Sequence, residues 1–347
     1  MKVTADLLKE YVKEMFEKTG FFPEDAEICA DCTVQTNLWG VDSHGILRTP
    51  AYINRVEHGA VNPKPNIRYT KGEDGPLALM SGDDGMGYVV ADRCMDAAVE
   101  KAKQFGMGSV LVNRSNHFGA AALFTRKAAD AGMLGIATTN VVPNIGMPGN
   151  TKAVTGNNPV ALAAPLNEPY NFSLDISMSA VSGGKLLLAI KKGEKIPATW
   201  AIDKDGNPTE DPQAGFDGIF LPTGMHKGLG MSLFIDLITG LLSGGPFLEN
   251  MMGMYKYPDK PSGTTHLFSV IDPEFFMSRE EYGRRIDTWV QMIKETPMAD
   301  PSKKQIIPGE LEYLKEQERL RDGIPLPEEL VEDLRKLEKK LGMTNRL

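Results

Sequence analysis

The segment Val41-Asp42-Ser43-His44-Gly45-Ile46-Leu47-Arg48 brings a hydroxyl, an imidazole and a guanidinium close together along the chain. An imidazole exchanges protons near neutral pH, and a guanidinium can bind a carboxylate through two parallel hydrogen bonds. We therefore interpret His44 as a solvent-accessible acid or base, Arg48 as the partner of a substrate carboxylate, and Ser43 as a neighbour of the reacting group. The alternative is a structural histidine behind a capping serine, and the triplet alone does not separate the two.

A second polar turn, Asn113-Arg114-Ser115-Asn116-His117-Phe118-Gly119, resembles the first in chemistry. We expect it to open a helix over 119–131, with Ser115 and Asn116 available as helix caps. A helix N-terminus lowers the proton affinity of a histidine, so His117 is predicted to act as a base or as a hydrogen-bond donor to a carbonyl. Two such turns in a chain with five histidines predict an enzyme that acts on a small acid.

Two further charged residues occupy unusual positions. Asp175 lies inside the predicted strand 172–177, where a carboxylate needs a partner; it is expected to orient an imidazole or to hold a ribose hydroxyl. Lys227 starts a predicted helix, where its charge is unfavourable unless it faces an anion such as a substrate or a cofactor phosphate. The alternatives are an edge-strand carboxylate and an exposed lysine, both facing water.

Composition excludes several classes of function. The chain of 347 residues carries a net charge of −8, which argues against general binding to nucleic acid or to anionic membranes. The most apolar segment, 228–248, contains Asp236 and is expected to form a buried core helix rather than a membrane span. The three cysteines, with no secretory signal, predict free buried thiols and a cytoplasmic protein.

Hydrophobic periodicity predicts alternating helices and strands, which is typical of the α/β class. Helices are expected at 5–18, 23–38, 49–58, 89–105, 119–131, 179–191, from 226 onward, and at 278–294, 310–320 and 327–341. Strands are expected at 109–112, 134–139, 172–177 and 265–271. Segment 140–158 lacks periodicity and is interpreted as a binding loop. No G-x-G-x-x-G and no Walker A sequence is present, so a nucleotide would bind by a route other than a Rossmann unit or a P-loop.

Several blocks in the same order resemble the malate/L-lactate dehydrogenase type of NAD(P)-dependent oxidoreductase, over about residues 7–341. The blocks are Asp42-Ser43-His44-Gly45, Ser115-Asn116-His117-Phe118-Gly119, Thr139-Asn140, Thr155-Gly156-Asn157-Asn158-Pro159, Leu174 to Ser179, Lys227-Gly228-Leu229-Gly230, Leu242-Ser243-Gly244-Gly245 and Pro308-Gly309-Glu310. That type also includes ureidoglycolate dehydrogenase, 2,3-diketogulonate reductase, sulfolactate dehydrogenase and piperideine-2-carboxylate reductase.

The resemblance implies a non-Rossmann dinucleotide-binding fold with a mixed sheet, a helical N-terminal region and a C-terminal helical tail. It implies an N-terminal part at 1–75, a cofactor-binding domain at 76–265, and a segment at 266–347 that returns to the first part. The cofactor would be NAD, with NADP as the alternative, in a homodimer whose subunits both shape the site. The partners would be a small 2-hydroxy or 2-oxo acid and a second copy of the chain, without nucleic acid or membrane.

The resemblance also assigns roles to residues. The catalytic set would be His44, His117, Ser43 and Asp175, the substrate-binding set Arg48 and Lys227, and the cofactor-binding set His117, Asn140, Asn157, Asp175, Ile176, Ser177, Lys227, Gly309 and Glu310. No metal ligands are expected. The chain departs from the family in Asp175-Ile176-Ser177-Met178-Ser179, where Asp-Met-Ala-Thr-Ser is usual and a threonine hydroxyl is lost. It also has Met225-His226 where an aromatic residue is common.

The predicted reaction is hydride transfer between a 2-hydroxy acid and a 2-oxo acid, with a histidine as acid or base. His44 and His117 compete for that role. Within the same family, reduction of a cyclic imine and the ureidoglycolate or diketogulonate reactions remain open. Outside it, a metal-dependent lyase or aldolase and a binding protein without catalysis are the alternatives.

Overall fold

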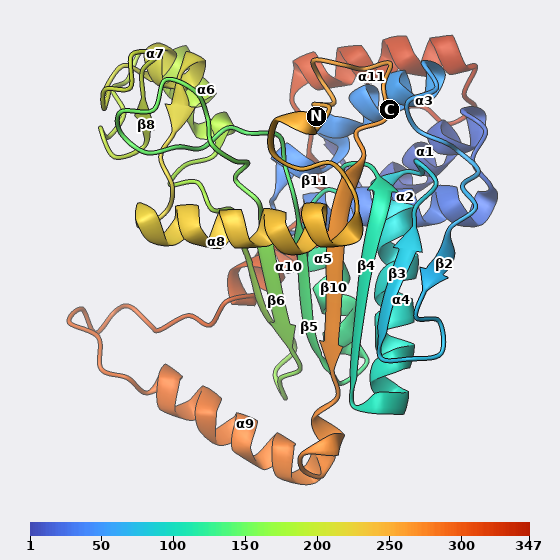
Figure 1. Cartoon of the computed structure of the whole chain (residues 1–347), viewed down its shortest axis with the longest axis vertical. Helices are drawn as coiled ribbons and strands as arrows, with labels where there is room; N and C mark the ends of the chain where they lie inside the picture. Colours follow the sequence, from blue (N-terminus) through green and yellow to red (C-terminus); the bar gives the residue numbers. More distant parts are fainter.

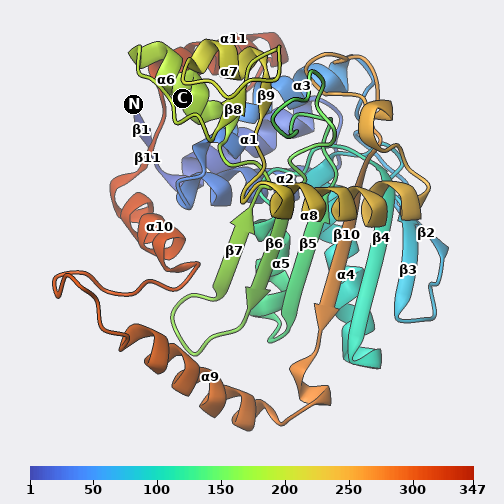
Figure 2. The same ribbon diagram turned by 60° about the vertical axis from the view of Figure 1, so that its left-hand side comes forward.

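A seven-stranded sheet forms the centre of the molecule, whose computed structural model describes all residues from 1 to 347 (Figures 1 and 2). The strand order is β2-β3-β4-β10-β5-β6-β7. The strands are β2 (Arg68–Lys71), β3 (Leu77–Ser81), β4 (Met107–Ser115), β5 (Leu134–Thr139), β6 (Val160–Ala164), β7 (Phe172–Ile176) and β10 (Thr264–Ile271). Only β3 and β4 pair in parallel. The mixed sheet confirms the predicted α/β, non-Rossmann class, because a Rossmann domain has a mostly parallel, doubly wound sheet.

The helices lie close to the predicted ranges, except for α7, which was not predicted. They are α1 (Ala5–Lys18), α2 (Pro23–Leu38), α3 (Thr49–Glu57), α4 (Gly87–Phe105), α5 (Ala122–Asp130), α6 (Gly183–Lys192), α7 (Pro212–Asp217), α8 (His226–Asp236), α9 (Arg279–Lys294), α10 (Glu310–Asp322) and α11 (Glu328–Leu341). Strands β2, β3 and β6 were not predicted, and neither were the two-residue pairs β1 (Lys2–Val3) with β11 (Ile324–Pro325) and β8 (Ala201–Ile202) with β9 (Ile219–Phe220).

The core lies between the sheet and the helices of the N-terminal region. Helix α1 begins at a capping threonine, Thr4, whose hydroxyl accepts a hydrogen bond from the Leu7 N–H. Its apolar stripe is buried and includes Leu8, Tyr11, Val12, Met15 and Phe16. Helices α4 and α5 cover one face of the sheet (Figure 2). This packing fixes the end of β4, from which the second histidine turn departs.

The two ends of the chain meet. Strand β1 pairs antiparallel with β11, and the Tyr11 hydroxyl in α1 donates to the Leu334 carbonyl in α11. Segments from both ends therefore form one part of the molecule, as the predicted return of segment 266–347 requires. The predicted domain boundaries stay a prediction; strand β10 runs across the boundary between residues 265 and 266.

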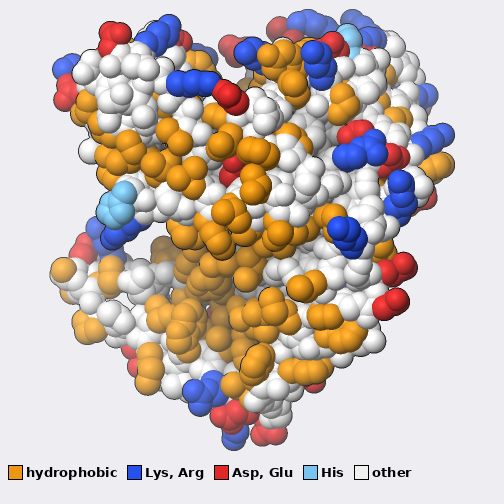
Figure 3. Space-filling model, in the orientation of Figure 1, with side chains coloured by type: hydrophobic (Ala, Val, Ile, Leu, Met, Phe, Trp, Pro, Cys, Tyr) orange, Lys and Arg blue, Asp and Glu red, His pale blue; other side chains and the backbone are white.

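Helix α8 corrects the prediction of a buried core helix over 228–248. With the following π-helical turn, Leu237–Leu241, it lies across the face of the sheet opposite α4 (Figure 1). Met231, Phe234, Leu237, Leu241 and Leu242 are exposed on it. The helix is apolar on all sides, but a single chain offers a sheet to only one of them. Figure 3 shows apolar side chains gathered over α8 and over the hollow below it. None of the helices has the length and apolarity needed to cross a membrane.

A buried histidine joins the three central strands. The Nδ1 of His266 in β10 lies 2.8 Å from Thr139 Oγ1 in β5, and its Nε2 lies 2.8 Å from Ser115 Oγ in β4. Its ring stacks on Phe118 at a centroid distance of 4.5 Å. Burial lowers the pKa of His266 to about 3, so the ring is neutral at pH 7.

This burial predicts a specific acid sensitivity. As pH falls from 6.5 toward about 3, the unfolded chain binds a proton at residue 266 that the folded chain does not, so stability falls with pH. One such proton gives a slope of about 1.4 kcal/mol per pH unit. Urea unfolding across this range should show that His266→Gln reduces the slope by up to one proton. The control is His226→Gln, which removes an exposed histidine; equal slopes for wild type and His266→Gln would contradict the prediction.

Candidate active site

The two predicted histidine turns converge. The rings of His44 and His117 lie with centroids 5.8 Å apart and planes inclined by 23°. His44 ends a 3-10 turn, Asp42–His44, between α2 and α3, while His117 lies in the loop that follows β4. Arg48 ends the next 3-10 turn, Ile46–Arg48, and its charge acts on both imidazoles. The predicted grouping of two imidazoles with one guanidinium is therefore present within a single chain.

The His44 turn is held from both ends of the sequence. In the last turn of α2, Asn37 accepts a hydrogen bond from the Ile46 N–H and donates one to Asp42 Oδ1, each 2.8 Å long. A Cβ on Gly45 would lie 2.2 Å from the Asn37 oxygen, so this close approach requires glycine. From α10, Arg319 donates to both carboxylate oxygens of Asp42. Such a two-pronged guanidinium–carboxylate pair fixes orientation as well as distance.

His44 differs electrostatically from its predicted state. Its Nδ1 lies 2.9 Å from the Ser43 hydroxyl, and its carbonyl accepts a hydrogen bond from the Tyr88 hydroxyl. Burial, assisted by the positive charge of Arg48, lowers the pKa of His44 to about 4. The prediction of a solvent-accessible ring titrating near neutrality is therefore wrong: the ring is partly buried and neutral at pH 7.

His117 is fixed in one tautomer. Its Nδ1 lies 2.7 Å from the Tyr52 hydroxyl and 3.4 Å from the Gly119 N–H, which donates to it. Burial raises the pKa of Tyr52, so its hydroxyl keeps a proton to donate to the same nitrogen. With donors on Nδ1, the neutral ring carries its own proton on Nε2. His117 thus presents an N–H that makes no hydrogen bond within the chain.

The predicted cause of the His117 shift is wrong. Helix α5 begins at Ala122, beyond the histidine, and Ser115 and Asn116 do not cap it. Its first N–H groups are met instead by Asp175, whose Oδ2 accepts from the Ala122 N–H at 2.9 Å. The pKa of His117 is lowered first by burial, then by the electrostatic cost of charging it next to the His44 ring, and then by the charge of Arg48.

Asp175 itself lies apart from both imidazoles and makes no hydrogen bond to either. It is exposed at the surface, yet the protein around its carboxylate raises its pKa to about 6. The hydrogen bond from the N-terminus of α5 explains why a carboxylate, Asp175, lies near the end of β7, and it requires no ligand.

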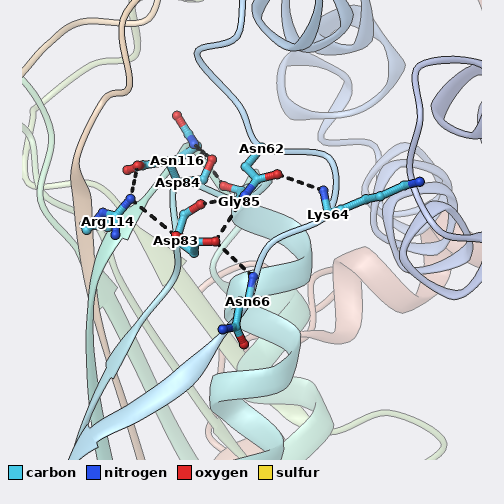
Figure 4. Close-up of polar contacts among 8 residues, drawn as sticks. All are labelled: Asn62, Lys64, Asn66, Asp83, Asp84, Gly85, Arg114 and Asn116. Atoms are coloured by element: carbon cyan, nitrogen blue, oxygen red, sulfur yellow. Dashed lines mark hydrogen bonds and ion pairs between the residues drawn. The ribbon is translucent and has the colours of Figure 1, made fainter.

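Asn116, which precedes His117 in the chain, is anchored to the turn at Asp84 and Gly85 (Figure 4). Its Nδ2 donates to the carbonyls of Asp84 and Gly85, each at 2.9 Å. The turn that carries these carbonyls is strained, because Asp83 and Asp84 have φ values of 51° and 56°. Arg114 forms ion pairs with both aspartates and holds them against the end of β4. The position of His117 is therefore set by its buried neighbour as well as by the hydrogen bonds of its own ring.

Arg48 has no acidic partner. Its Nε donates to the Ser43 carbonyl at 2.7 Å, and its Nη1 donates to the Tyr255 hydroxyl. A positive charge beside two neutral imidazoles, without a carboxylate of the protein to offset it, favours the entry of an anion.

Five of the residues predicted to bind the cofactor form a second group around α8: Asn140, Asn157, Ile176, Ser177 and Lys227. Asn140 is buried: its Oδ1 accepts from the Thr265 N–H and its Nδ2 donates to the Pro246 carbonyl, both at 3.0 Å. Asn157 Oδ1 accepts from the Asn144 side chain at 3.0 Å. The side-chain amides of Asn140 and Asn157 are therefore engaged in hydrogen bonds that stabilise the surrounding loops. Three other members of this group remain open to a ligand, namely Ile176, Ser177 and Lys227.

The open members differ in chemistry. Ile176 exposes an apolar side chain at the end of β7, and the Ser177 hydroxyl lies 3.1 Å from that of Ser179. Lys227 is exposed in the first turn of α8, and its amine makes no hydrogen bond or ion pair within the chain. A free ammonium at a helix N-terminus suits a phosphate group.

Gly309 and Glu310 lie at the other end of β7. Gly309 has φ of 101°, and a Cβ there would lie 2.3 Å from the Asn171 carbonyl oxygen. Glu310 begins α10 and accepts a hydrogen bond from the Tyr170 hydroxyl at 3.0 Å. Neither residue contacts the imidazole pair in the single chain, so their link to a cofactor stays a prediction.

The sequence interpretation missed three residues that complete the site: Tyr52, Arg55 and Tyr255. Tyr52 and Arg55 follow Arg48 at positions i+4 and i+7, which places them on the face of α3 that continues from Arg48. That periodicity could have identified both residues. Tyr255 lies in a loop without periodicity, and no local signal links it to Arg48.

The tautomer of His117 can be tested directly. In protein labelled with ¹⁵N at histidine, the His117 resonances should show an unprotonated Nδ1 and a protonated Nε2 at pH 7. Tyr52→Phe removes the stronger donor and should increase the Nδ1–H population. Tyr11→Phe, which removes a buried hydroxyl bonded to the Leu334 carbonyl, serves as the control. A protonated Nδ1 in the wild-type protein would refute the assignment.

Comparison with known proteins agrees with this geometry. The family model described as malate/L-lactate dehydrogenase matches residues 3–335. The malate dehydrogenase of Pyrococcus horikoshii is 37% identical, covering 99% of this chain and 96% of that protein. The ureidoglycolate dehydrogenase (NAD(+)) of Escherichia coli is 30% identical, covering 96% and 94% respectively. The solved structure of sulfolactate dehydrogenase from Methanocaldococcus jannaschii superimposes with a TM-score of 0.93 at 36% identity, covering 99% of this chain and 98% of that one. The chain therefore belongs to the malate/L-lactate dehydrogenase family of oxidoreductases.

Proposed function

We propose that this protein interconverts a small 2-hydroxy acid and the corresponding 2-oxo acid with NAD or NADP. The observation that carries the proposal is the Arg48 guanidinium, which has no acidic partner and lies beside two neutral imidazoles. This arrangement provides one cation for a carboxylate and two nitrogen groups for the oxygen on the adjacent carbon. The relatives named for malate, sulfolactate and ureidoglycolate all act on hydroxy acids of this kind.

The two imidazoles take different roles. His117 offers an Nε2–H, which suits a hydrogen bond to the C2 oxygen of the substrate. The Nδ1 of His44 lies 2.9 Å from the Ser43 hydroxyl; in the tautomer that donates an Nδ1–H to this oxygen, Nε2 is left to accept the hydroxyl proton during oxidation and to return it during reduction. Arg48 holds the carboxylate and thereby orients C2. The nicotinamide, when bound, accepts or supplies the hydride.

The open residues around α8 fit a dinucleotide. Lys227 provides an unpaired ammonium at the N-terminus of α8, Ser177 a hydroxyl, and Ile176 an exposed apolar surface. These groups would hold a phosphate, a ribose and a planar ring respectively. Asp175 contributes a carboxylate in the same strand, although its Oδ2 is already engaged by α5.

A panel of substrates tests the reaction class. Pyruvate, oxaloacetate, sulfopyruvate and a cyclic 2-carboxyimine would each be mixed with NADH or NADPH and followed by absorbance of the reduced cofactor. Oxidation of either cofactor with one of the 2-oxo acids is expected, also after treatment with a chelator. Activity that requires a divalent ion without cofactor oxidation would favour a lyase. Cofactor binding without turnover on any acid or imine would favour a binding protein.

The exposed apolar surface supports a homodimer. Phe234, Leu237 and Leu241 on the α8 segment and Trp289 and Met292 on α9 are all exposed in the single chain. A gathering of exposed apolar side chains on a folded chain generally marks an interface, and the second copy is the partner that the family implies. Sedimentation at micromolar concentration should give a dimer, and Leu237→Glu should give a monomer; a wild-type monomer would refute this proposal.

We also place the enzyme in the cytoplasm, because all three cysteines are free and buried.

Removing the proposed base should slow the chemical step. His44→Ala should lower kcat by about 10²–10⁴-fold, because a positioned acid or base contributes about that much. Cofactor affinity, measured by fluorescence titration of NADH, should be unchanged, since His44 is not among the residues around α8. His58→Ala, an exposed histidine at the end of α3, is the control. Wild-type turnover in His44→Ala would remove His44 from the mechanism.

A further inference from the structure

A loop next to the active site, residues 251–263, is held in place by Arg55. This arginine is buried in α3, and its guanidinium lies 3.3, 3.1 and 3.0 Å from the carbonyl oxygens of Met254, Tyr257 and Lys260. It also lies 2.9 Å from the Ser262 hydroxyl. Every one of these loop acceptors is uncharged, so Arg55 serves the loop rather than a carboxylate. The 251–263 loop therefore has a defined shape although its sequence has no periodicity.

The anchored loop places Tyr255 against Arg48. The guanidinium carbon of Arg48 lies 5.6 Å from the centre of the Tyr255 ring, and Nη1 donates a hydrogen bond to the Tyr255 hydroxyl. Both residues are close enough to act electrostatically on Tyr52, the partner of His117. Tyr255 is thus part of the same site as the imidazole pair, although it comes from a distant part of the chain and is 63% exposed.

The hydrogen bonds leave two donors free at this point. Arg48 uses Nε for the Ser43 carbonyl and Nη1 for Tyr255, which leaves its Nη2 without a partner in the chain. The Tyr255 oxygen accepts from Arg48, so its own O–H remains available and has no acceptor in the chain. A guanidinium N–H and a phenolic O–H therefore lie side by side next to His44. Two adjacent donors match the two oxygens of a carboxylate.

We propose that Tyr255 is a substrate-binding residue. Its hydroxyl donates to one oxygen of the substrate carboxylate, while Nη2 of Arg48 donates to the other. The proposal deepens the proposed function and rests on it for the identity of the ligand as a 2-oxo or 2-hydroxy acid. It also gives a role to the hydrogen bonds of Arg55 to uncharged loop acceptors, which keep Tyr255 in place before substrate arrives.

The test uses Tyr255→Phe and the unreactive carboxylate oxamate. Calorimetric titration of oxamate into the protein saturated with NADH should show about tenfold weaker binding in the variant, because a hydrogen bond to a charged group typically contributes about that factor or more. The KM for the 2-oxo acid turned over by wild type should rise by the same factor. The kcat should stay within about twofold, since the hydroxyl binds substrate and transition state alike.

Tyr257→Phe is the matched control, because Tyr257 lies in the same loop and its hydroxyl does not contact Arg48. It should leave oxamate affinity unchanged. Unchanged affinity in Tyr255→Phe would overturn the proposal, and tighter binding would show instead that the hydroxyl blocks Arg48. If wild type binds oxamate but turns over none of the acids, the proposed function fails while the Tyr255 comparison still decides this inference. Absence of oxamate binding to wild type would overturn both.

Discussion

An unbalanced positive charge governs this site. Arg48 lies beside His44 and His117 without a carboxylate of the protein, and its field adds to burial in keeping both rings neutral. An arriving carboxylate offsets that charge, which removes one of the causes that lower the pKa of His44. We infer that substrate binding raises the proton affinity of the ring that must take the proton. The rest of the site, including the glycine contact at Gly45, holds these groups in place.

Local pattern was sufficient for most of the helices, for the central strands β4, β5 and β10 and for the two histidine turns, but not for β2, β3 and β6. Helices α1 and α2 and strand β5 were predicted at their observed bounds, because caps, periodicity and a proline mark them clearly. Convergence of the two turns could be expected only from resemblance, since nothing local to residue 44 specifies residue 117. Burial was misjudged at His44 because solvent exposure depends on distant segments. Asp175 was predicted to take part in catalysis or cofactor binding. A carboxylate in a strand can equally accept hydrogen bonds from the first N–H groups of a neighbouring helix, as Asp175 does at α5.

The α8 segment shows the other limit of sequence interpretation. An all-round apolar helix predicts cover on every side, but the sequence does not specify whether that cover comes from the same chain or from a second copy. Here the chain supplies the sheet beneath α8 and leaves Phe234 and Leu237 outside. The same helix carries Lys227 at its start. An interface formed on α8 would therefore stiffen the segment that presents this cation to the cofactor.

The pairing of Arg319 with Asp42 has a consequence for synthesis. The two residues are separated by 277 positions, yet this contact completes the turn that carries His44. On a ribosome, the first histidine turn emerges early and has to wait until α10 has been translated before it acquires its final shape. Contacts of such long sequence separation also slow folding. A nascent chain thus lacks this support for the His44 turn until nearly its whole length has been made.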